Sequence, residues 1–153
     1  MRIRPASAAD AQAIHELVQR AYSHYVPRMG GPPGPMREDY AAKVAEGGTS
    51  VAEDDGEIVG LIVLAREPDH LLIENVAVDP GRQGEGIGRE LLAFAETEAR
   101  DAGLSTLRLY THVTMTENRA FYPRLGYEET HRKPVGEFEL VFFAKQLPGD
   151  GAT

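Results

Sequence analysis

The chain has 153 residues, a formal net charge of −8 and no cysteine. The lack of cysteine excludes a disulfide scaffold, a thiolate metal site and a cysteine nucleophile, and no apolar run approaches the roughly 18 residues of a membrane-spanning helix. Because 24 acidic residues outnumber 16 basic ones, the composition argues against a nucleic-acid-binding protein, and we expect a cytoplasmic protein without a metal site.

The first expected elements are a short strand and an amphipathic helix. Residues 2–4 are expected to form the strand, which ends at Pro5. The helix follows Ser7, and Asp10 three residues later completes a weak capping box. Apolar residues then recur at helical spacing, which predicts one buried helix face; they are Ile14, Leu17, Val18 and Ala21.

Glycine and proline dominate residues 27–36, so this segment is expected to have no regular structure. A short helix is expected over residues 37–45, closed by Gly47 and Gly48. Strands are expected on either side of a hairpin turn, over residues 50–53 and 57–65. The next strand, residues 71–78, is apolar on both faces, which is typical of a central strand.

The second half of the chain alternates helices and strands. A helix is expected from near Gly86 to before Gly103, then a strand over residues 104–111, a helix over 117–125 and terminal strands, of which residues 138–147 are the clearest. Residues 148–153 are expected to be a flexible tail. The order of elements predicts a mixed α/β domain rather than a doubly wound parallel sheet.

A glycine-rich segment joins the central strand directly to the long helix. Its sequence over residues 76–92 is VAVDPGRQGEGIGRELL. Glycines let the backbone approach a ligand closely, and the N–H groups and dipole of the helix N-terminus favour a negative charge. The segment therefore predicts a pyrophosphate-binding loop, to which Arg82 and Arg89 could add charge-assisted contacts.

The spacing of the glycines restricts the ligand. The loop has no lysine, as an ATP-binding P-loop would require, and Arg89 occupies the place of the third glycine of a dinucleotide fingerprint. The pattern that does fit is Q-x-x-G-x-G, at Gln83, Gly86 and Gly88. It resembles the acetyl-coenzyme A (acetyl-CoA) loop of the GNAT N-acetyltransferase superfamily. The alternative is a tight strand-to-helix connection without a ligand.

A second segment, NRAFYPRLGY over residues 118–127, resembles the second signature of the same superfamily. Its spacing between Asn118 and Tyr122 is shorter than the commoner form. The resemblance implies a single GNAT-like domain over residues 1–147, with a twisted mixed sheet of six or seven strands and helices on both faces. It also implies that the fourth and fifth strands splay apart to admit the pantetheine arm of the cofactor.

The resemblance implies that acetyl-CoA is bound by one strand, the glycine loop and the second signature. By position in this sequence, the cofactor-binding residues are Val76, Ala77, Val78, Arg82, Gln83, Gly84, Glu85, Gly86, Ile87, Gly88, Arg89, Asn118, Phe121 and Tyr122. The implied reaction moves the acetyl group to an amine by direct attack in a ternary complex. A non-catalytic module that binds or senses acyl-CoA, and transfer of a longer acyl group, remain alternatives.

Acetyl transfer needs a group that protonates the leaving thiolate and a group that accepts a proton from the amine. The resemblance points to Tyr122 as the proton donor; the alternative is a buried tyrosine that donates to a backbone partner. Glu74 is the candidate base, because a carboxylate among apolar neighbours would have a raised pKa. Tyr110 and His112 are rivals for this role.

The acceptor site is expected between the first two helices, where aromatic rings and a proline-rich loop could hold an apolar or cationic amine; the alternative is a loop that packs on its own prolines. The candidate substrate residues are Tyr22, Tyr25, Met36, Glu74 and Tyr110. Residues 138–147 could leave a strand edge free for a homodimer.

Overall fold

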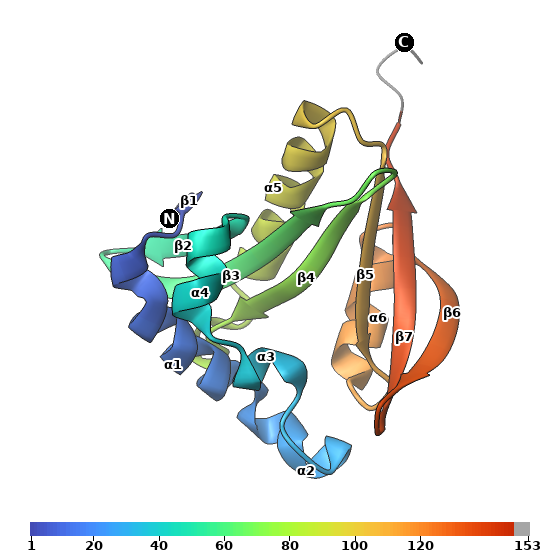
Figure 1. Cartoon of the computed structure of the whole chain (residues 1–153), viewed down its shortest axis with the longest axis horizontal. Coiled ribbons are helices and arrows are strands. Elements are labelled where there is room, and N and C mark those ends of the chain that lie inside the picture. Colours follow the sequence, from blue (N-terminus) through green and yellow to red (C-terminus); the bar gives the residue numbers. More distant parts are fainter. Residues whose placement is uncertain (149–153) are drawn as a thin grey trace.

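The computed structural model describes residues 1–148 and contains one seven-stranded mixed sheet in the order β1-β2-β3-β4-β5-β7-β6 (Figure 1). The strands are β1 (Arg2–Pro5), β2 (Thr49–Asp54), β3 (Glu57–Arg66), β4 (Leu71–Val78), β5 (Thr106–His112), β6 (Glu128–Val135) and β7 (Phe138–Gln146). The mixed α/β fold predicted from the element order is confirmed. The expected tail lies almost wholly outside the described residues.

Two apolar clusters lie against the sheet, one for each set of helices. Helices α1 (Ala11–Tyr22) and α4 (Tyr40–Glu46) contribute Ile14, Leu17, Val18 and Tyr40 to one cluster. Helices α5 (Ile87–Asp101) and α6 (Thr116–Arg124) contribute to the other, which contains Leu91, Leu92 and Tyr122. The expectation of helices on both faces is therefore confirmed, because each amphipathic helix buries its apolar face against the sheet.

The prediction that residues 27–36 have no regular structure is wrong. Two helical turns lie there, α2 (Val26–Met29) and α3 (Gly34–Arg37). Pro27 and Pro35 each occupy the first turn of a helix, where the missing N–H removes no hydrogen bond. Gly30 ends α2 in the left-handed region with φ 77°. Prolines therefore begin these turns rather than prevent them.

The following helix begins later than predicted. The expected start was residue 37, but α4 begins at Tyr40, because Asp39 caps it and its carboxylate accepts the N–H of Ala42 at 3.2 Å. Just before α1, Asp10 accepts the N–H of Ser7 at 2.7 Å, as the predicted capping box requires. Asp10 also accepts two hydrogen bonds from Arg4, at 2.8 and 3.0 Å.

Strands β4 and β5 run parallel and separate after three residue pairs. Pairing covers Leu71 with Leu107, Leu72 with Arg108, and Ile73 with Leu109. Beyond Ile73, β4 remains paired with β3 on its other side, up to Val78. The expected splay between the fourth and fifth strands is thus confirmed, and Figure 1 shows the two ribbons diverging.

The prediction of a free edge at residues 138–147 is wrong. Strand β7 lies between β5 and β6 and pairs antiparallel with both. The edge strand at this end of the sheet is instead β6, whose eight residues are all exposed. This edge carries charged side chains and Pro134, which are features that hinder pairing with another strand.

Candidate active site

The glycine loop directs the N-terminus of α5 toward the gap between β4 and β5. After β4 ends, Asp79 accepts the N–H of Gly81 at 2.9 Å and caps a 3-10 turn, Pro80–Arg82. Gly84 and Gly86 then adopt φ values of 84° and 83°, and α5 follows at once. Only glycine adopts this left-handed conformation without strain, which explains the residue type at both positions.

A cleft of about 710 Å³ lies beside this loop. All the expected cofactor-binding residues line it except Glu85. Glu85 instead accepts two hydrogen bonds from the Arg82 guanidinium, each at 3.0 Å. The loop thus presents its backbone to the cleft, while this carboxylate is held by a cation.

The cations of the cleft differ in what they already bind. Arg82 pairs with both Asp54 and Glu85, and these two carboxylates raise its pKa. Arg89 and Arg124 also line the cleft, and neither has an ion pair within residues 1–148. Arg124 was missed by the sequence analysis, although it lies three residues after Phe121 on one helix face, with its guanidinium carbon 5.8 Å from that ring.

One edge of β4 borders the cleft without a strand partner. Residues 75–78 pair with β3 on one side, and β5 has already diverged on the other. Their unpaired N–H and C=O groups can receive an extended chain that carries amides, as an added strand would. Val76, Ala77 and Val78 of this edge line the cleft, so the geometry fits the pantetheine arm of coenzyme A.

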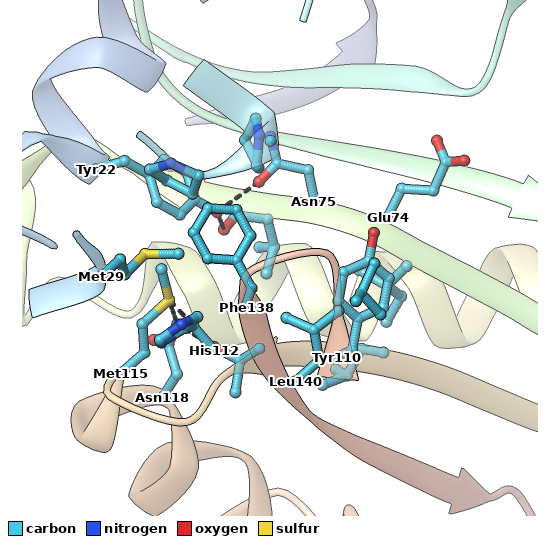
Figure 2. Close-up of a pocket in the computed structure, with 18 of the residues that line it drawn as sticks. Tyr22, Met29, Glu74, Asn75, Tyr110, His112, Met115, Asn118, Phe138 and Leu140 are labelled. Atoms are coloured by element: carbon cyan, nitrogen blue, oxygen red, sulfur yellow. Dashed lines mark hydrogen bonds between the residues drawn. The ribbon is translucent and has the colours of Figure 1, made fainter. Parts of the chain in front are cut away.

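A second, smaller cavity of about 220 Å³ lies on the other side of the gap (Figure 2). Its walls come from the α2–α3 segment, the first half of the β4 edge, β5, the start of α6 and the β6–β7 hairpin. The proline-rich segment contributes Met29, Pro33, Gly34 and Pro35. This segment was expected to wall an acceptor pocket, and it does line the cavity.

The two cavities share four lining residues: Tyr22, Val76, Asn118 and Tyr122. A group bound at this junction can be reached from both sides. The Tyr22 hydroxyl donates to the Asn75 amide oxygen at 2.6 Å, and the Asn118 amide donates to the Thr111 hydroxyl at 3.3 Å. Both polar side chains are therefore held in place by the protein before any ligand binds.

Tyr122 has an uncommitted hydroxyl at this junction. Its residue is 5% exposed, and its ring packs against Phe121, Tyr127 and Phe143. Within residues 1–148 the hydroxyl has no hydrogen-bond partner, so the backbone partner considered as the alternative is not there. Burial raises the pKa of the Tyr122 phenol, so it keeps its proton at neutral pH.

Glu74 lines the smaller cavity, but its surroundings differ from those expected. Its carboxylate pairs with the Lys43 ammonium of α4 at 2.9 Å rather than lying among apolar groups alone. This hydrogen bond raises the pKa of Lys43. The sequence could not reveal the pair, because Lys43 and Glu74 belong to elements that only the tertiary fold brings together.

His112 is buried in the same cavity with a defined tautomer. Its Nδ1 accepts the backbone N–H of Thr114 at 3.1 Å, so the ring proton is on Nε2. Burial lowers the pKa of His112. The neutral ring therefore has no free acceptor for a proton, which removes it as a rival base.

The comparisons with known proteins decide the family. A family model described as "Acetyltransferase (GNAT) family" matches residues 11–127. The chain belongs to the GNAT acetyltransferase family. It is therefore an acyltransferase, and acetyl-CoA is its co-substrate, as the two signatures predicted.

Individual relatives of this acetyltransferase cover most of its length. An aminoalkylphosphonate N-acetyltransferase of Salmonella typhimurium is 29% identical, over 84% of this chain and 86% of its own. An aminoglycoside N(6')-acetyltransferase of Stenotrophomonas maltophilia is 31% identical, over 85% and 88%. The PaiA N-acetyltransferase of Thermoplasma acidophilum, solved with coenzyme A, shares the fold with a TM-score of 0.79 and 19% identity, over 95% and 98% of the two chains.

Two of the expected substrate residues of this acetyltransferase do not line the acceptor cavity. Tyr25 lines the cofactor cleft, where its ring packs against His24 at 3.9 Å between centroids. Met36 packs on the cluster formed with α1, and its carbonyl accepts the Gln19 amide at 2.8 Å. Tyr22, Glu74 and Tyr110 do line the cavity. Residues that the sequence analysis missed include Asn75, Met115, Phe138 and Leu140.

No helix of residues 1–148 is long and apolar enough to cross a membrane. Over the same residues, no three acidic or histidine side chains are grouped so that they could hold a metal ion.

Proposed function

We propose that the protein transfers the acetyl group of acetyl-CoA directly to a primary amine while both are bound. The observation that carries this proposal is the junction of the two cavities at Tyr22, Val76, Asn118 and Tyr122. An amine in the smaller cavity can reach a thioester in the larger one without a covalent enzyme intermediate. Two relatives are named for acceptors that carry primary amines, which supports the same acceptor group here.

The cofactor is held by the β4 edge, the loop and α6. The backbone of Val76–Val78 pairs with the pantetheine amides, and the N–H groups over residues 83–88 bind the pyrophosphate. Arg89 and Arg124 supply positive charge to the phosphates. Arg82 contributes its backbone, since its guanidinium is already held by two carboxylates.

Tyr122 is the proposed proton donor. The neutral amine nitrogen attacks the thioester carbonyl carbon, a C–N bond forms, and the C–S bond then breaks. The sulfur leaves as a thiolate and takes the proton of the Tyr122 hydroxyl, which has no competing partner in the protein. The nitrogen releases one proton to a base, the phenolate regains a proton from solvent as that base returns its own, and the products are the amide and the free thiol.

Glu74 is the proposed acceptor of the amine proton, through a chain of water molecules that reaches it from the junction. It is the carboxylate that lines the cavity, whereas His112 carries its proton on Nε2. Tyr110 keeps its proton, because the partial loss of water around its phenol raises its pKa and the Glu74 charge adds to the effect. Lys43 fixes the position of the carboxylate through its ion pair.

We also propose that the protein acts in the cytoplasm and as a homodimer. The exposed edge strand β6 disfavours strand pairing through its charged side chains and Pro134, so the proposed dimer would use another surface. Light scattering coupled to size-exclusion chromatography measures the mass directly, and a monomeric mass at micromolar concentration would contradict the dimer. Fractionation of cells tests the location.

A thermal-shift titration tests the proposed function. Acetyl-CoA is titrated beside coenzyme A, ATP and NAD, and a ligand at one hundred times its dissociation constant stabilises the folded state by about 2.7 kcal/mol. We expect a shift with both coenzyme A forms only. An amine panel with a free-thiol readout follows. Absence of any shift with saturating acetyl-CoA would overturn the cofactor site, and binding without acetylation of any amine would overturn the transfer.

A further inference from the structure

Exposed apolar side chains gather at the mouth of the acceptor cavity. Within residues 1–148, the large hydrophobic residues with high exposure are Met1, Tyr110 at 40% and Val135 at 46%. Tyr110 and Val135 both line the cavity, although they come from β5 and β6. The two side chains therefore add exposed apolar surface to the lining of the cavity.

The apolar lining continues from the mouth to the interior. Phe138 and Leu140 of β7 line it together with Leu109 of β5, and Met29 and Met115 close the far end. Figure 2 shows the Phe138 ring in the middle of this space, with Glu74 and Tyr110 at one end and the two methionines at the other. Methionine side chains adapt to irregular apolar shapes, so the interior suits a compact hydrocarbon group.

The side chains of Glu74 and Asn75 in the same cavity already have partners. Among the described lining residues Glu74 is the one carboxylate and there is no lysine or arginine, and the Lys43 ammonium pairs with Glu74 at 2.9 Å. The Asn75 amide binds the hydroxyls of Tyr22 and Tyr40, at 2.6 and 3.2 Å. A second charge on the acceptor would therefore lose its water without gaining a partner.

We propose that the acceptor is a small primary monoamine with an aromatic or alkyl body and no second charged group. This inference rests on the proposed function and narrows its substrate. The amino group lies at the junction near Tyr122, and the hydrocarbon body lies against Phe138, Leu140 and Tyr110. The group-transfer step is the one already given, in which the amine nitrogen replaces the sulfur on the acetyl carbon.

The size of the cavity agrees with such an acceptor. Its volume of about 220 Å³ is below the roughly 300–1,000 Å³ of pockets for drug-sized ligands. An aminoglycoside would exceed it and bring several ammonium groups, and an aminoalkylphosphonate would bring a phosphonate that no cation of the lining meets. These are the acceptors named for two relatives, so we expect a different preference in this chain.

The test is a comparison of kcat/KM across amines, with saturating acetyl-CoA and free thiol as the readout. The panel contains phenethylamine, a series from propylamine to pentylamine, 2-aminoethylphosphonate, kanamycin and an uncharged tripeptide amide with a free N-terminus. We expect phenethylamine to exceed the two charged acceptors at least tenfold. Along the alkyl series, kcat/KM should rise about fourfold per added methylene.

Two variants test whether the preference among amines arises in the cavity. Phe138→Ala should lower kcat/KM for phenethylamine at least tenfold through KM, while acetyl-CoA still raises the melting temperature. Phe94→Ala is the matched control, because Phe94 is also half-buried but lies on α5 and lines neither cavity. It should leave the preference among amines unchanged.

The possible outcomes separate this inference from the proposed function. Equal kcat/KM along the alkyl series would overturn the proposal of an apolar monoamine acceptor but not the proposal of acetyltransferase activity. A preference for kanamycin, the phosphonate or the tripeptide would have the same consequence. Acetyl-CoA binding without acetylation of any amine would overturn both. A preference for phenethylamine that Phe138→Ala removes and Phe94→Ala keeps would support the inference.

Discussion

The replacement Tyr122→Phe separates the chemical role of one hydroxyl from its role in packing. The ring of Tyr122 contacts Phe121, Tyr127 and Phe143 at centroid distances of 5.8, 6.0 and 5.7 Å. Such aromatic pairs contribute about 0.5–1.5 kcal/mol each, and phenylalanine keeps all three. Since the hydroxyl has no partner within residues 1–148, its removal leaves no donor or acceptor unpaired.

We therefore expect the free energy of unfolding of Tyr122→Phe to stay within about 0.5 kcal/mol of the wild type. Turnover should fall about 10²–10⁴-fold, the usual contribution of a positioned proton donor, with little change in acetyl-CoA affinity. Because burial raises the pKa of Tyr122, the wild-type rate should show no alkaline loss from this group below about pH 10.

The assay is free-thiol release at saturating acetyl-CoA and amine, beside urea unfolding of the same samples. Tyr127→Phe is the matched control. Tyr127 packs in the same cluster, and its buried hydroxyl also has no partner among the described residues, but it does not line either cavity. Unchanged turnover in Tyr122→Phe, or an equal loss in both variants, would refute the assignment of Tyr122 as the proton donor.

Three further predictions concern binding and stability. Arg124→Ala should raise the Kd for coenzyme A about tenfold, because one charged hydrogen bond is lost. Arg132→Ala on the sheet edge, where Arg132 pairs with Glu129, should leave this Kd unchanged. Titration calorimetry measures the Kd of both variants. Gly60→Ala should lower the free energy of unfolding in urea by about 1–3 kcal/mol, because the new Cβ would lie 3.1 Å from side-chain atoms of Ile87 and Leu91. Gly34→Ala is the control, because its new Cβ would meet nothing within 4 Å. Equal unfolding free energies of the two variants would contradict this packing. Asp10→Asn should cost about 1.5–3 kcal/mol at pH 7. Arg4 holds the pKa of Asp10 well below its usual range. The wild type therefore has this extra stability above about pH 4 and loses it as the pH falls toward the lowered pKa. Urea unfolding at pH 7 and pH 3 should show that the difference in unfolding free energy between wild type and variant shrinks on acidification.

The features that local sequence determines were predicted correctly. The glycine loop follows from Gly84 and Gly86, since a left-handed backbone between a strand and a helix requires glycine. The buried faces of α1 and α5 follow from the spacing of their apolar residues. The exception is the proline-rich segment, where proline was interpreted as a breaker although it stands in the first turn of α2 and α3.

The features that depend on distant residues were decided by the tertiary structure. Glu74 meets Lys43, and Arg82 meets Asp54, across separate elements, so composition and spacing could not reveal which charges are free. Strand order is also non-local, since β7 inserts between β5 and β6. The sequence by itself determined the family, the cofactor loop and the mixed fold, because these depend on backbone conformation and periodicity within a few residues. Only the packing of β4, β5 and the β6–β7 hairpin decided the shape and charge of the acceptor cavity, because its walls come from segments that are far apart in the chain.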